Sequence, residues 1–265
     1  MVDFATHSTA SDGALDTIVQ RIAPLVQPEL ILLFGSRAAG TARDDSDYDV
    51  MLVLREAEAI EPARAAANKA LGDAGLSVDV LACTVEEYQR RQHDPGYLSW
   101  LIAREGRVLY TTGRVPQRSP SPDRVREAGG GEGLAMWIRR AESDLRAAEN
   151  SLAAAHPSWD AICFHAHACV EKLLKALIVT RGTFPPRTHQ LKDLLALQEE
   201  GIRESAVIIR ACGLLTALYP KARYPEAPEP SPAEAHSAMA TAREARLLLM
   251  SRLDRWAAIA ERPDR

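Results

Sequence analysis

The first 112 residues alternate between two patterns of apolar positions. Short apolar runs of the length and composition of β-strands occur at 29–34 (ELILLF), 47–54 (DYDVMLVL), 77–82 (SVDVLA) and 107–111 (RVLYT). Helical stretches are predicted between or beside them, at 15–26, 62–72 and 97–104. Strands that alternate with helices in this way are typical of an α/β domain.

From residue 134 onward the apolar residues recur with helical spacing. Positions three and four apart between Leu134 and Leu152 predict a helix with one buried stripe. A second helix is expected to begin after Ser158, a good N-cap, and to end at Gly182, which suits a left-handed C′ position. Further helices are predicted at 191–197, 202–218 and after Ser231-Pro232 through Trp256. This half of the chain therefore reads as an all-α bundle.

A polar segment separates the two halves. Residues 113–133, GRVPQRSPSPDRVREAGGGEG, concentrate proline, serine, glycine and charge, which predicts a linker. The expected organisation is a domain at 1–112, a linker at 113–133 and a helical domain at 134–262. A second proline-rich stretch, 225–232, is interpreted as a stiff surface connection.

Composition and charge exclude several classes of protein. With 46% hydrophobic and 26% charged residues the chain is neither collagen-like nor disordered. The net charge of −4 gives no large positive field for duplex nucleic acid. The 4 cysteines form no C-x-x-C pair, which favours free thiols in a reducing compartment. No signal peptide or membrane-spanning run is recognised, so we expect a cytoplasmic protein without membrane partners.

Candidate chemistry begins where the first apolar run ends. Gly35 and Ser36 follow a predicted strand and precede a predicted helical turn. A residue without Cβ lets backbone N–H groups approach phosphate oxygens, and serine adds a hydroxyl donor. This short segment is therefore interpreted as a phosphate cradle, although a glycine-serine turn taken alone is more often only a turn.

Three aspartates extend this candidate site. Asp47 and Asp49 are two residues apart on an extended chain, so they share a face at about 6.6 Å along the strand. At about 6 Å they repel by roughly 3 kcal/mol, a cost that a divalent cation, Mg²⁺, would reverse. Asp79 interrupts another apolar strand. If that strand pairs beside the first, Asp79 joins the cluster, where it completes the metal shell or accepts a proton from an attacking hydroxyl.

This order of residues resembles the minimal nucleotidyltransferases of the DNA polymerase beta superfamily. Their pattern G-S-x-A-x-G, S-D-x-D and a third aspartate is matched by Gly35, Ser36, Ala38, Gly40, Ser46, Asp47, Asp49 and Asp79. The resemblance implies Mg²⁺ and catalytic roles for Asp47, Asp49 and Asp79, and nucleotide binding by Gly35, Ser36, Arg37 and Ser46. Arg37 and Arg43 could reach phosphate, or could be ordinary solubilising loop charges. The implied fold class is α+β, a nucleotidyltransferase domain with a small mixed sheet before an all-α bundle.

The helical half resembles the HEPN family. FHAHACVEKLLKALIVTRG, PPRTHQLKDL and ARYPE carry the match, and the two-domain plan is similar to that of kanamycin nucleotidyltransferases. Some HEPN domains are ribonucleases with an R-x4–6-H pattern, which a partner transferase silences by adding AMP to a tyrosine. Here Arg181 is too far from His189, Arg187 is too near, and Leu191 occupies the place of that tyrosine. The pattern does not predict ribonuclease activity.

Other polar residues of the helical half have structural interpretations. His165 and His167 are expected to point in different directions, which disfavours a shared metal ion. Glu171 and Lys175 have the spacing of an ordinary helical ion pair. His189 is expected to cap or orient the following helix. The tryptophans Trp137, Trp159 and Trp256 are expected in the core or in a dimer contact.

Two functional hypotheses follow. The first is a Mg²⁺-dependent nucleotidyltransferase that moves AMP from ATP to a hydroxyl of a small molecule, or to a protein tyrosine in a toxin–antitoxin type system, with a homodimer formed through the helical domain. Tyr219 and Tyr224 are candidate internal acceptors. The alternative is a catalytically quiet module that binds a nucleotide or RNA and dimerises through its HEPN-like domain.

Overall fold

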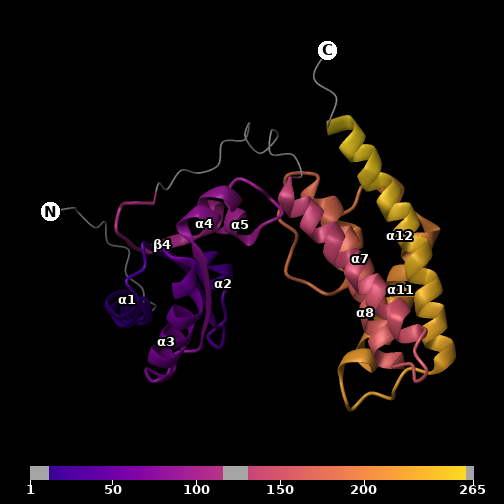
Figure 1. Cartoon of the computed structure of the whole chain (residues 1–265), viewed down its shortest axis with the longest axis horizontal. Coiled ribbons are helices and arrows are strands. Elements are labelled where there is room, and N and C mark those ends of the chain that lie inside the picture. Colours follow the sequence, from indigo (N-terminus) through magenta and orange to yellow (C-terminus); the bar gives the residue numbers. More distant parts are fainter. Residues whose placement is uncertain (1–11, 116–130, 261–265) are drawn as a thin grey trace. The chain divides into compact units, whose positions relative to one another are not determined.

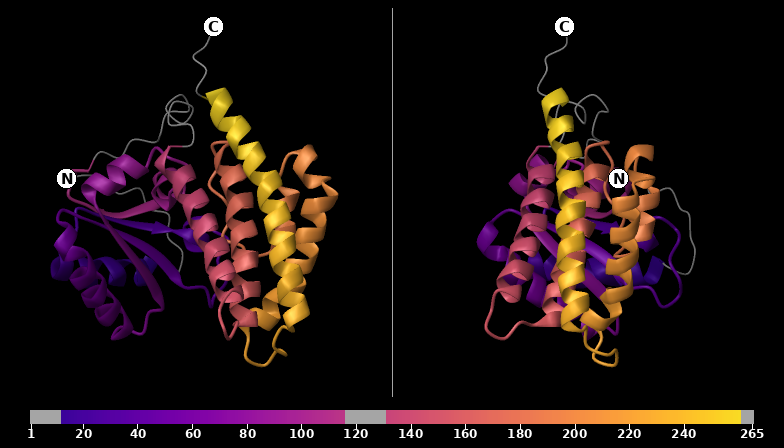
Figure 2. Two further views of the ribbon diagram at one scale, coloured as in Figure 1. Left: turned by 45° about the vertical axis from the view of Figure 1, so that its right-hand side comes forward. Right: turned by 90° about the vertical axis from the view of Figure 1, so that its right-hand side faces the viewer.

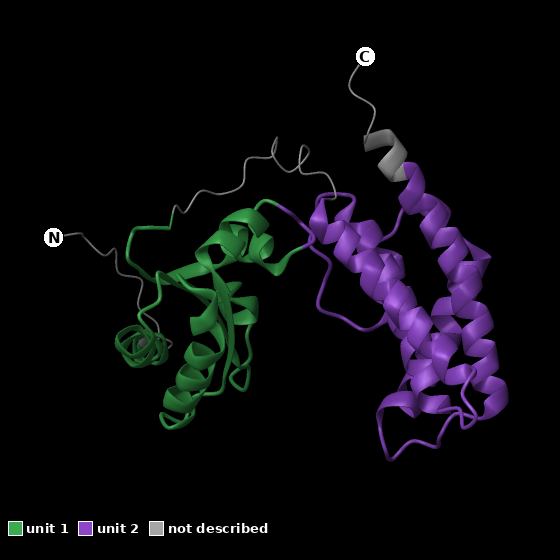
Figure 3. Ribbon diagram, in the orientation of Figure 1, with its two compact units in different colours: residues 1–93, 97–122 green, residues 94–96, 123–265 purple. Residues whose placement is uncertain are grey.

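The computed structural model describes residues 12–115 and 131–260 (Figure 1). The chain divides into two compact units (Figure 3). Unit 1 comprises residues 1–93 and 97–122, and unit 2 comprises residues 94–96 and 123–265. The short segment 94–96 thus belongs to unit 2, although it lies between two helices of unit 1. The apolar pattern of the sequence did not indicate that this segment belongs to unit 2.

Unit 1 is built on a four-stranded mixed sheet. Its strands are β1 (Leu30–Phe34), β2 (Tyr48–Leu54), β3 (Val78–Thr84) and β4 (Arg107–Thr111), in the order β3-β2-β1-β4. β1 pairs antiparallel with β2 and β4, whereas β2 and β3 are parallel. The four apolar runs of the sequence therefore form strands as predicted. β1 and β2 are central, which explains why their sequences are almost continuously apolar.

Helices cover both faces of this sheet. They are α1 (Asp12–Val26), α2 (Gly35–Ala38), the 3₁₀ turn η1 (Ala57–Ala59), α3 (Ile60–Gly72), α4 (Val85–Arg91) and α5 (Leu98–Glu105). α1 and α3 pack on the face that presents Val50 and Val80. α4 and α5 contribute Tyr88 and Ile102 to the core on the opposite face, beside Met51. Because side chains alternate along β2, this strand contributes residues to the core on each face of the sheet.

Helix α4 is absent from the sequence prediction. It begins with a reciprocal cap, in which the Thr84 hydroxyl accepts from the Glu87 N–H at 3.1 Å and the Thr84 N–H donates to the Glu87 carboxylate at 3.1 Å. The pattern Thr-x-x-Glu is a known signature of a helix start. It stands in the printed sequence at 84–87 and could have revealed the helix.

The start of the predicted linker packs against unit 1. Val115 is 3% exposed and lies in the core on the α4 and α5 face. Nearby, the buried Glu29 carboxylate accepts hydrogen bonds from Arg55 and Thr112 and pairs with Arg114. Residues 116–130 lie outside the described residues, and the next helix begins at Glu132. A proline- and glycine-rich composition does not by itself show where packing stops.

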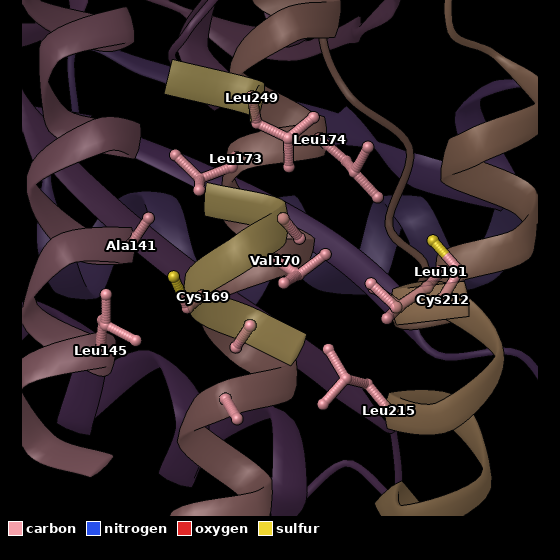
Figure 4. Close-up of a cluster of buried hydrophobic side chains, with 14 of the residues drawn as sticks. Ala141, Leu145, Cys169, Val170, Leu173, Leu174, Leu191, Cys212, Leu215 and Leu249 are labelled. Carbon is pink, nitrogen blue, oxygen red and sulfur yellow. The ribbon is translucent and has the colours of Figure 1, made fainter. Parts of the chain in front are cut away.

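Unit 2 is a helical bundle around one central helix. Its helices are α7 (Glu132–Leu152), α8 (Trp159–Val179), α9 (Leu191–Ala196), α10 (Glu200–Arg203), α11 (Ala206–Arg223) and α12 (Pro232–Ala260). α8 is buried on most of its surface and contacts α7, α9, α11 and α12. Leu145, Val170, Leu191, Leu215 and Leu249 meet in this core, each from a different helix (Figure 4). Among the described helices, none is long and apolar enough to cross a bilayer.

The helix boundaries agree with the predictions at some positions and differ at others. Gly182 has a φ of 69°, as its predicted left-handed position requires. α12, the long yellow helix of Figure 2, begins at Pro232 after a reciprocal cap between Ser231 and Glu234. Ser158 occupies the N-cap of α8, but its hydroxyl donates to the Asp160 carboxylate at 2.5 Å and makes no cap. The single helix predicted at 202–218 is wrong, because the chain breaks between α10 and α11 at residues 204–205.

Segment 94–96 packs against the first turn of α7. The buried Asp94 carboxylate accepts from the Gly133 N–H at 2.9 Å and the Gly96 N–H at 2.8 Å, and the Trp137 indole donates to the Gly96 carbonyl at 3.0 Å. A Cβ on Gly96 would lie 2.5 Å from the Gly133 Cα. Asp94 thus satisfies an N-terminal amide of a helix that is distant in the sequence.

Candidate functional site

The turn after β1 has a backbone conformation that favours glycine. Gly35 has a φ of 75° and begins the short helix α2. The loop closes behind it, where the Thr41 N–H donates to the Ser36 carbonyl at 2.9 Å. An L-residue in this left-handed region is destabilised by about 1–2 kcal/mol, so the conformation alone accounts for glycine at this position.

A carboxylate lies directly against Gly35. A Cβ built on Gly35 would fall 1.9 Å from Oδ2 and 2.9 Å from Cγ of Asp49. The approach follows from the sheet, because Asp49 is the antiparallel partner of Phe34, the last residue of β1. Gly35 is therefore constrained twice, by its φ and by the space that the Asp49 carboxylate occupies.

Asp79 lies beside Asp49 on the neighbouring strand. The two residues are register partners in the parallel pair β2 and β3, and neighbouring strands are about 4.8 Å apart. Val50 and Val80 face the α1 and α3 core, so Asp49 and Asp79 share the opposite face. The pairing of these two strands, which was the condition for Asp79 to join the candidate site, is present. Asp47 directly precedes β2, where the Tyr48 N–H donates to the Ser77 carbonyl at 3.0 Å.

These carboxylates have the donor chemistry that Mg²⁺ prefers. Mg²⁺ binds oxygen ligands and is usually held by one or two protein carboxylates together with substrate phosphates. Within residues 12–115 and 131–260, no group of three or more His, Cys, Asp or Glu side chains is gathered closely enough to hold a metal ion by itself. Asp49 and Asp79 therefore have the donor chemistry of two Mg²⁺ ligands on neighbouring strands. The convergence of all three aspartates on one ion stays a prediction.

Arg37 and Ser46 organise the loop before Asp47. The Arg37 guanidinium donates from Nε to the Ser46 carbonyl at 2.9 Å and stacks over the Tyr48 ring, 4.0 Å from its centroid. The Ser46 hydroxyl accepts from the Arg43 N–H at 2.9 Å. These contacts fix the loop that leads into β2. The contacts support positioning roles for Arg37 and Ser46, and their nucleotide contacts stay predictions.

Unit 2 contains a second polar cluster that the sequence interpretation underestimated. Glu171 and Lys175 are both buried, and Lys175 donates to the Glu171 carboxylate at 2.8 Å. His189 contacts the same carboxylate through Nδ1 at 3.1 Å. The N-cap of α9 is Gln190 and has no side-chain cap, so the structure does not show the capping role expected of His189, whereas a role in orienting α9 stays a prediction. The spacing of Glu171 and Lys175 did indicate a pair, but it could not reveal that the surrounding helices bury it.

The charges in this cluster alter two pKa values. Burial raises the pKa of Glu171, but the hydrogen bond and charge of Lys175, with those of His189, outweigh that effect, so the pKa lies below its ordinary value. Burial lowers the pKa of His167 to about 4. His165 instead contacts Asp144 at 2.9 Å, whereas the nearest carboxylate to His167 is that of Glu171, so the two histidines point in different directions, as predicted.

The two candidate acceptor tyrosines differ in their surroundings. The Tyr219 ring is tilted against that of His167, with centroids 4.3 Å apart, and the Tyr219 hydroxyl accepts from Arg223 at 2.8 Å. Tyr224 is 53% exposed. Trp137 and Trp159 pack partly buried against the helical core, whereas the side chain of Trp256 lies outside the described residues. Tyr219 is thus partly integrated in the bundle, and Tyr224 is open to solvent.

Comparison with protein families assigns both halves of the chain. The family model "Polymerase beta, Nucleotidyltransferase" matches residues 16–114, and the HEPN domain model matches residues 134–252. The first match contains every residue of the candidate site at the sheet edge, meaning the end of the sheet where β1 ends and β2 and β3 begin. The second begins and ends within the helical unit. A search of curated proteins returned no match.

Two solved structures are similar to parts of the chain. TT1696 from Thermus thermophilus is 28% identical over 44% of this chain and 96% of its own, with a TM-score of 0.39. A nucleotidyltransferase-like protein from Exiguobacterium sibiricum is 12% identical over 91% of this chain and 75% of its own, with a TM-score of 0.40.

Proposed function

From a chain in which a polymerase beta nucleotidyltransferase domain precedes a HEPN domain, we propose a Mg²⁺-dependent enzyme that transfers AMP from ATP to a hydroxyl group. The acceptor hydroxyl belongs to a small molecule or to a protein tyrosine. The observation that carries this proposal is the apposition of the Asp49 carboxylate and the glycine turn that follows β1. This apposition supports a site in which a phosphate and a metal ion bind side by side.

Each residue has a defined task in this proposal. The backbone N–H groups and hydroxyl of Gly35 and Ser36 hold the triphosphate. Asp47 and Asp49 hold Mg²⁺, which when bound neutralises phosphate charge and orients the α-phosphate. Asp79 accepts the proton of the attacking hydroxyl. A bond forms between the acceptor oxygen and the α-phosphorus, the bond from that phosphorus to the bridging oxygen breaks, and pyrophosphate leaves.

The experiment follows both products of the transfer. The full chain is incubated with each α-labelled nucleoside triphosphate and Mg²⁺, alone and with aminoglycosides or a cell extract, and parallel reactions contain EDTA. We expect pyrophosphate release with ATP, stopped by EDTA, and label on a hydroxyl-bearing acceptor. Release that is equal with and without divalent metal would contradict the proposal. Mass spectrometry of labelled protein distinguishes Tyr219 and Tyr224 from acceptors in the extract.

A second candidate function is a quiet binding module. Such a module would bind nucleotide or RNA and release no pyrophosphate. Calorimetric binding of ATP together with zero turnover in every acceptor mixture would support this candidate against the enzyme.

In the proposed function, the helical unit mediates dimerisation. It forms a homodimer in the cytoplasm, and a protein tyrosine acceptor would place the pair in a toxin–antitoxin type system. Ile209 on α11 is 50% exposed and Leu247 on α12 is 67% exposed, so each helix offers apolar surface. Light scattering on the protein as it elutes from a size-exclusion column tests for the homodimer. The mass of a monomer at all concentrations would exclude the dimer.

A further inference from the structure

A pocket in the helical unit is lined by three arginines and is distinct from the sheet edge. It lies where the end of α8, the segment from Gln198 to Ile202 and the C-terminal part of α12 come together, and its volume is about 260 Å³. Arg181 follows α8, and Arg252 and Arg255 are on α12. Leu177 and Ile202 provide apolar wall. The pocket is smaller than the sites of drug-sized ligands, so it suits a small molecule.

The pocket carries more positive than negative charge. Its lining residues include three arginines and a single acidic residue, Glu199. None of the three arginines makes an ion pair with another residue in the described part of the chain. Earlier on the same helix, Arg243 and Arg246 pair with Glu149 and Glu142 of α7. The arginines at this end of α12 therefore keep their charge available for a ligand.

A glycine makes room for one of these arginines. A Cβ on Gly201 of α10 would lie 3.2 Å from Nη2 of Arg252. The bare backbone thus lets the guanidinium lie close to α10, beside the apolar wall. Behind it, the buried amide of Gln198 donates to the carbonyls of Leu194 at 2.8 Å and Leu174 at 3.1 Å. These hydrogen bonds hold Gln198 in place, so this part of the pocket wall is fixed.

We propose that this pocket binds the phosphate monoester group of a small organic molecule. Planar guanidinium groups match the oxygens of a phosphate with paired hydrogen bonds. The charge of the pocket, three positive and one negative, also balances a phosphate dianion better than it balances a single carboxylate. Leu177 and Ile202 contact the organic part. Because none of these residues belongs to the nucleotidyltransferase domain, the proposal is independent of transfer activity.

Calorimetry on the full-length protein tests the proposal with three probes of matched ionic strength. The probes are butyl phosphate, inorganic phosphate and butyrate. We expect saturable binding in the order butyl phosphate, then phosphate, then butyrate. Tighter binding of butyrate, or no saturable binding of butyl phosphate, would overturn the proposal. Binding of single-stranded RNA at this pocket without binding of butyl phosphate would also overturn the proposal.

Variants locate the binding and distinguish it from folding defects. Arg252→Gln and Arg181→Gln should each weaken butyl phosphate binding about tenfold, because each removes charge-assisted hydrogen bonds. Glu199→Gln should tighten binding, an effect that a purely structural role would not produce. Arg243→Gln is the matched control on α12 and should leave the affinity unchanged. Equal affinities in the wild type and in both pocket arginine variants, with unaltered melting temperatures, would assign the binding elsewhere.

Discussion

The exposed aspartates of the candidate site in unit 1 differ from the partly or fully buried carboxylates of unit 2. In unit 2, Glu171, Asp144 and Glu142 accept hydrogen bonds from Lys175, Lys172 and Arg246 of the same unit. In unit 1, Asp47 and Asp79 are exposed at the sheet edge and make no ion pair within the described residues. Negative charge that the protein balances itself has a structural role. Negative charge that it leaves at one edge is suited to a cation from solution.

The largest expected effect concerns Asp47 at the sheet edge. Asp47→Asn should reduce Mg²⁺-dependent pyrophosphate release about 10³-fold, because metal ligation supplies several kcal/mol of transition-state stabilisation. The melting temperature should stay unchanged, since Asp47 is exposed. Asp45→Asn, a change of an exposed aspartate in the same loop, is the control and should keep full activity. Full activity of the Asp47 variant would remove our site assignment.

For the buried pair Glu171 and Lys175 in unit 2, a substitution should lower the stability of the protein. Glu171→Ala should lower the free energy of unfolding by about 3–5 kcal/mol, because it leaves the buried Lys175 ammonium without its partner. Denaturant unfolding measures this loss. The control Glu149→Ala removes an exposed partner of Arg243 and should cost less than about 1 kcal/mol. Equal losses in the two variants would show that the burial of Glu171 has no energetic consequence.

The low pKa of His167 predicts a stability that depends on pH. The unfolded chain binds a proton at the ordinary histidine pKa of about 6.5, whereas the folded protein binds it only near pH 4. Stability should therefore be complete above pH 6.5 and fall by about 3 kcal/mol as the pH drops to 4. His167→Gln should remove this part of the loss. Parallel urea titrations at several pH values measure it, and identical slopes in both proteins would refute the assignment.

Alanine substitutions at Gly35 and Gly40 distinguish the effect of backbone strain from the effect of the contact with Asp49. Gly35 and Gly40 have φ values of 75° and 71°, so alanine should destabilise either position by about 1–2 kcal/mol. Only at Gly35 would the new Cβ also displace the Asp49 carboxylate, whereas nothing lies within 4 Å at Gly40. We expect Gly35→Ala to lower transfer about 10²-fold and Gly40→Ala to leave it near the wild-type rate. Similar rates in the two variants would mean that the contact with Asp49 is unimportant.

Local sequence signals were sufficient for most of the elements, with the exceptions of α4 and the break between α10 and α11, and insufficient for the contacts between elements. The alternation in β2 predicted a central strand with its acidic residues at one end, and the lone Asp79 pointed to the neighbouring strand. The loop charge Arg37 was a different case. Its stacking on Tyr48 and its hydrogen bond to the Ser46 carbonyl depend on how the loop closes, which spacing does not reveal.

The sequence by itself determined the four strands, the helical second half and the order of the glycine turn and the aspartates, because periodicity and local spacing encode them directly. Only the tertiary structure decided that Asp49 rests against Gly35, that Asp94 caps α7, that Glu171 and Lys175 are buried, and that three arginines line one pocket. Most of these contacts join residues from different elements. Their energies depend on burial and on the closeness of the partners, and neither is a property of a short stretch of chain.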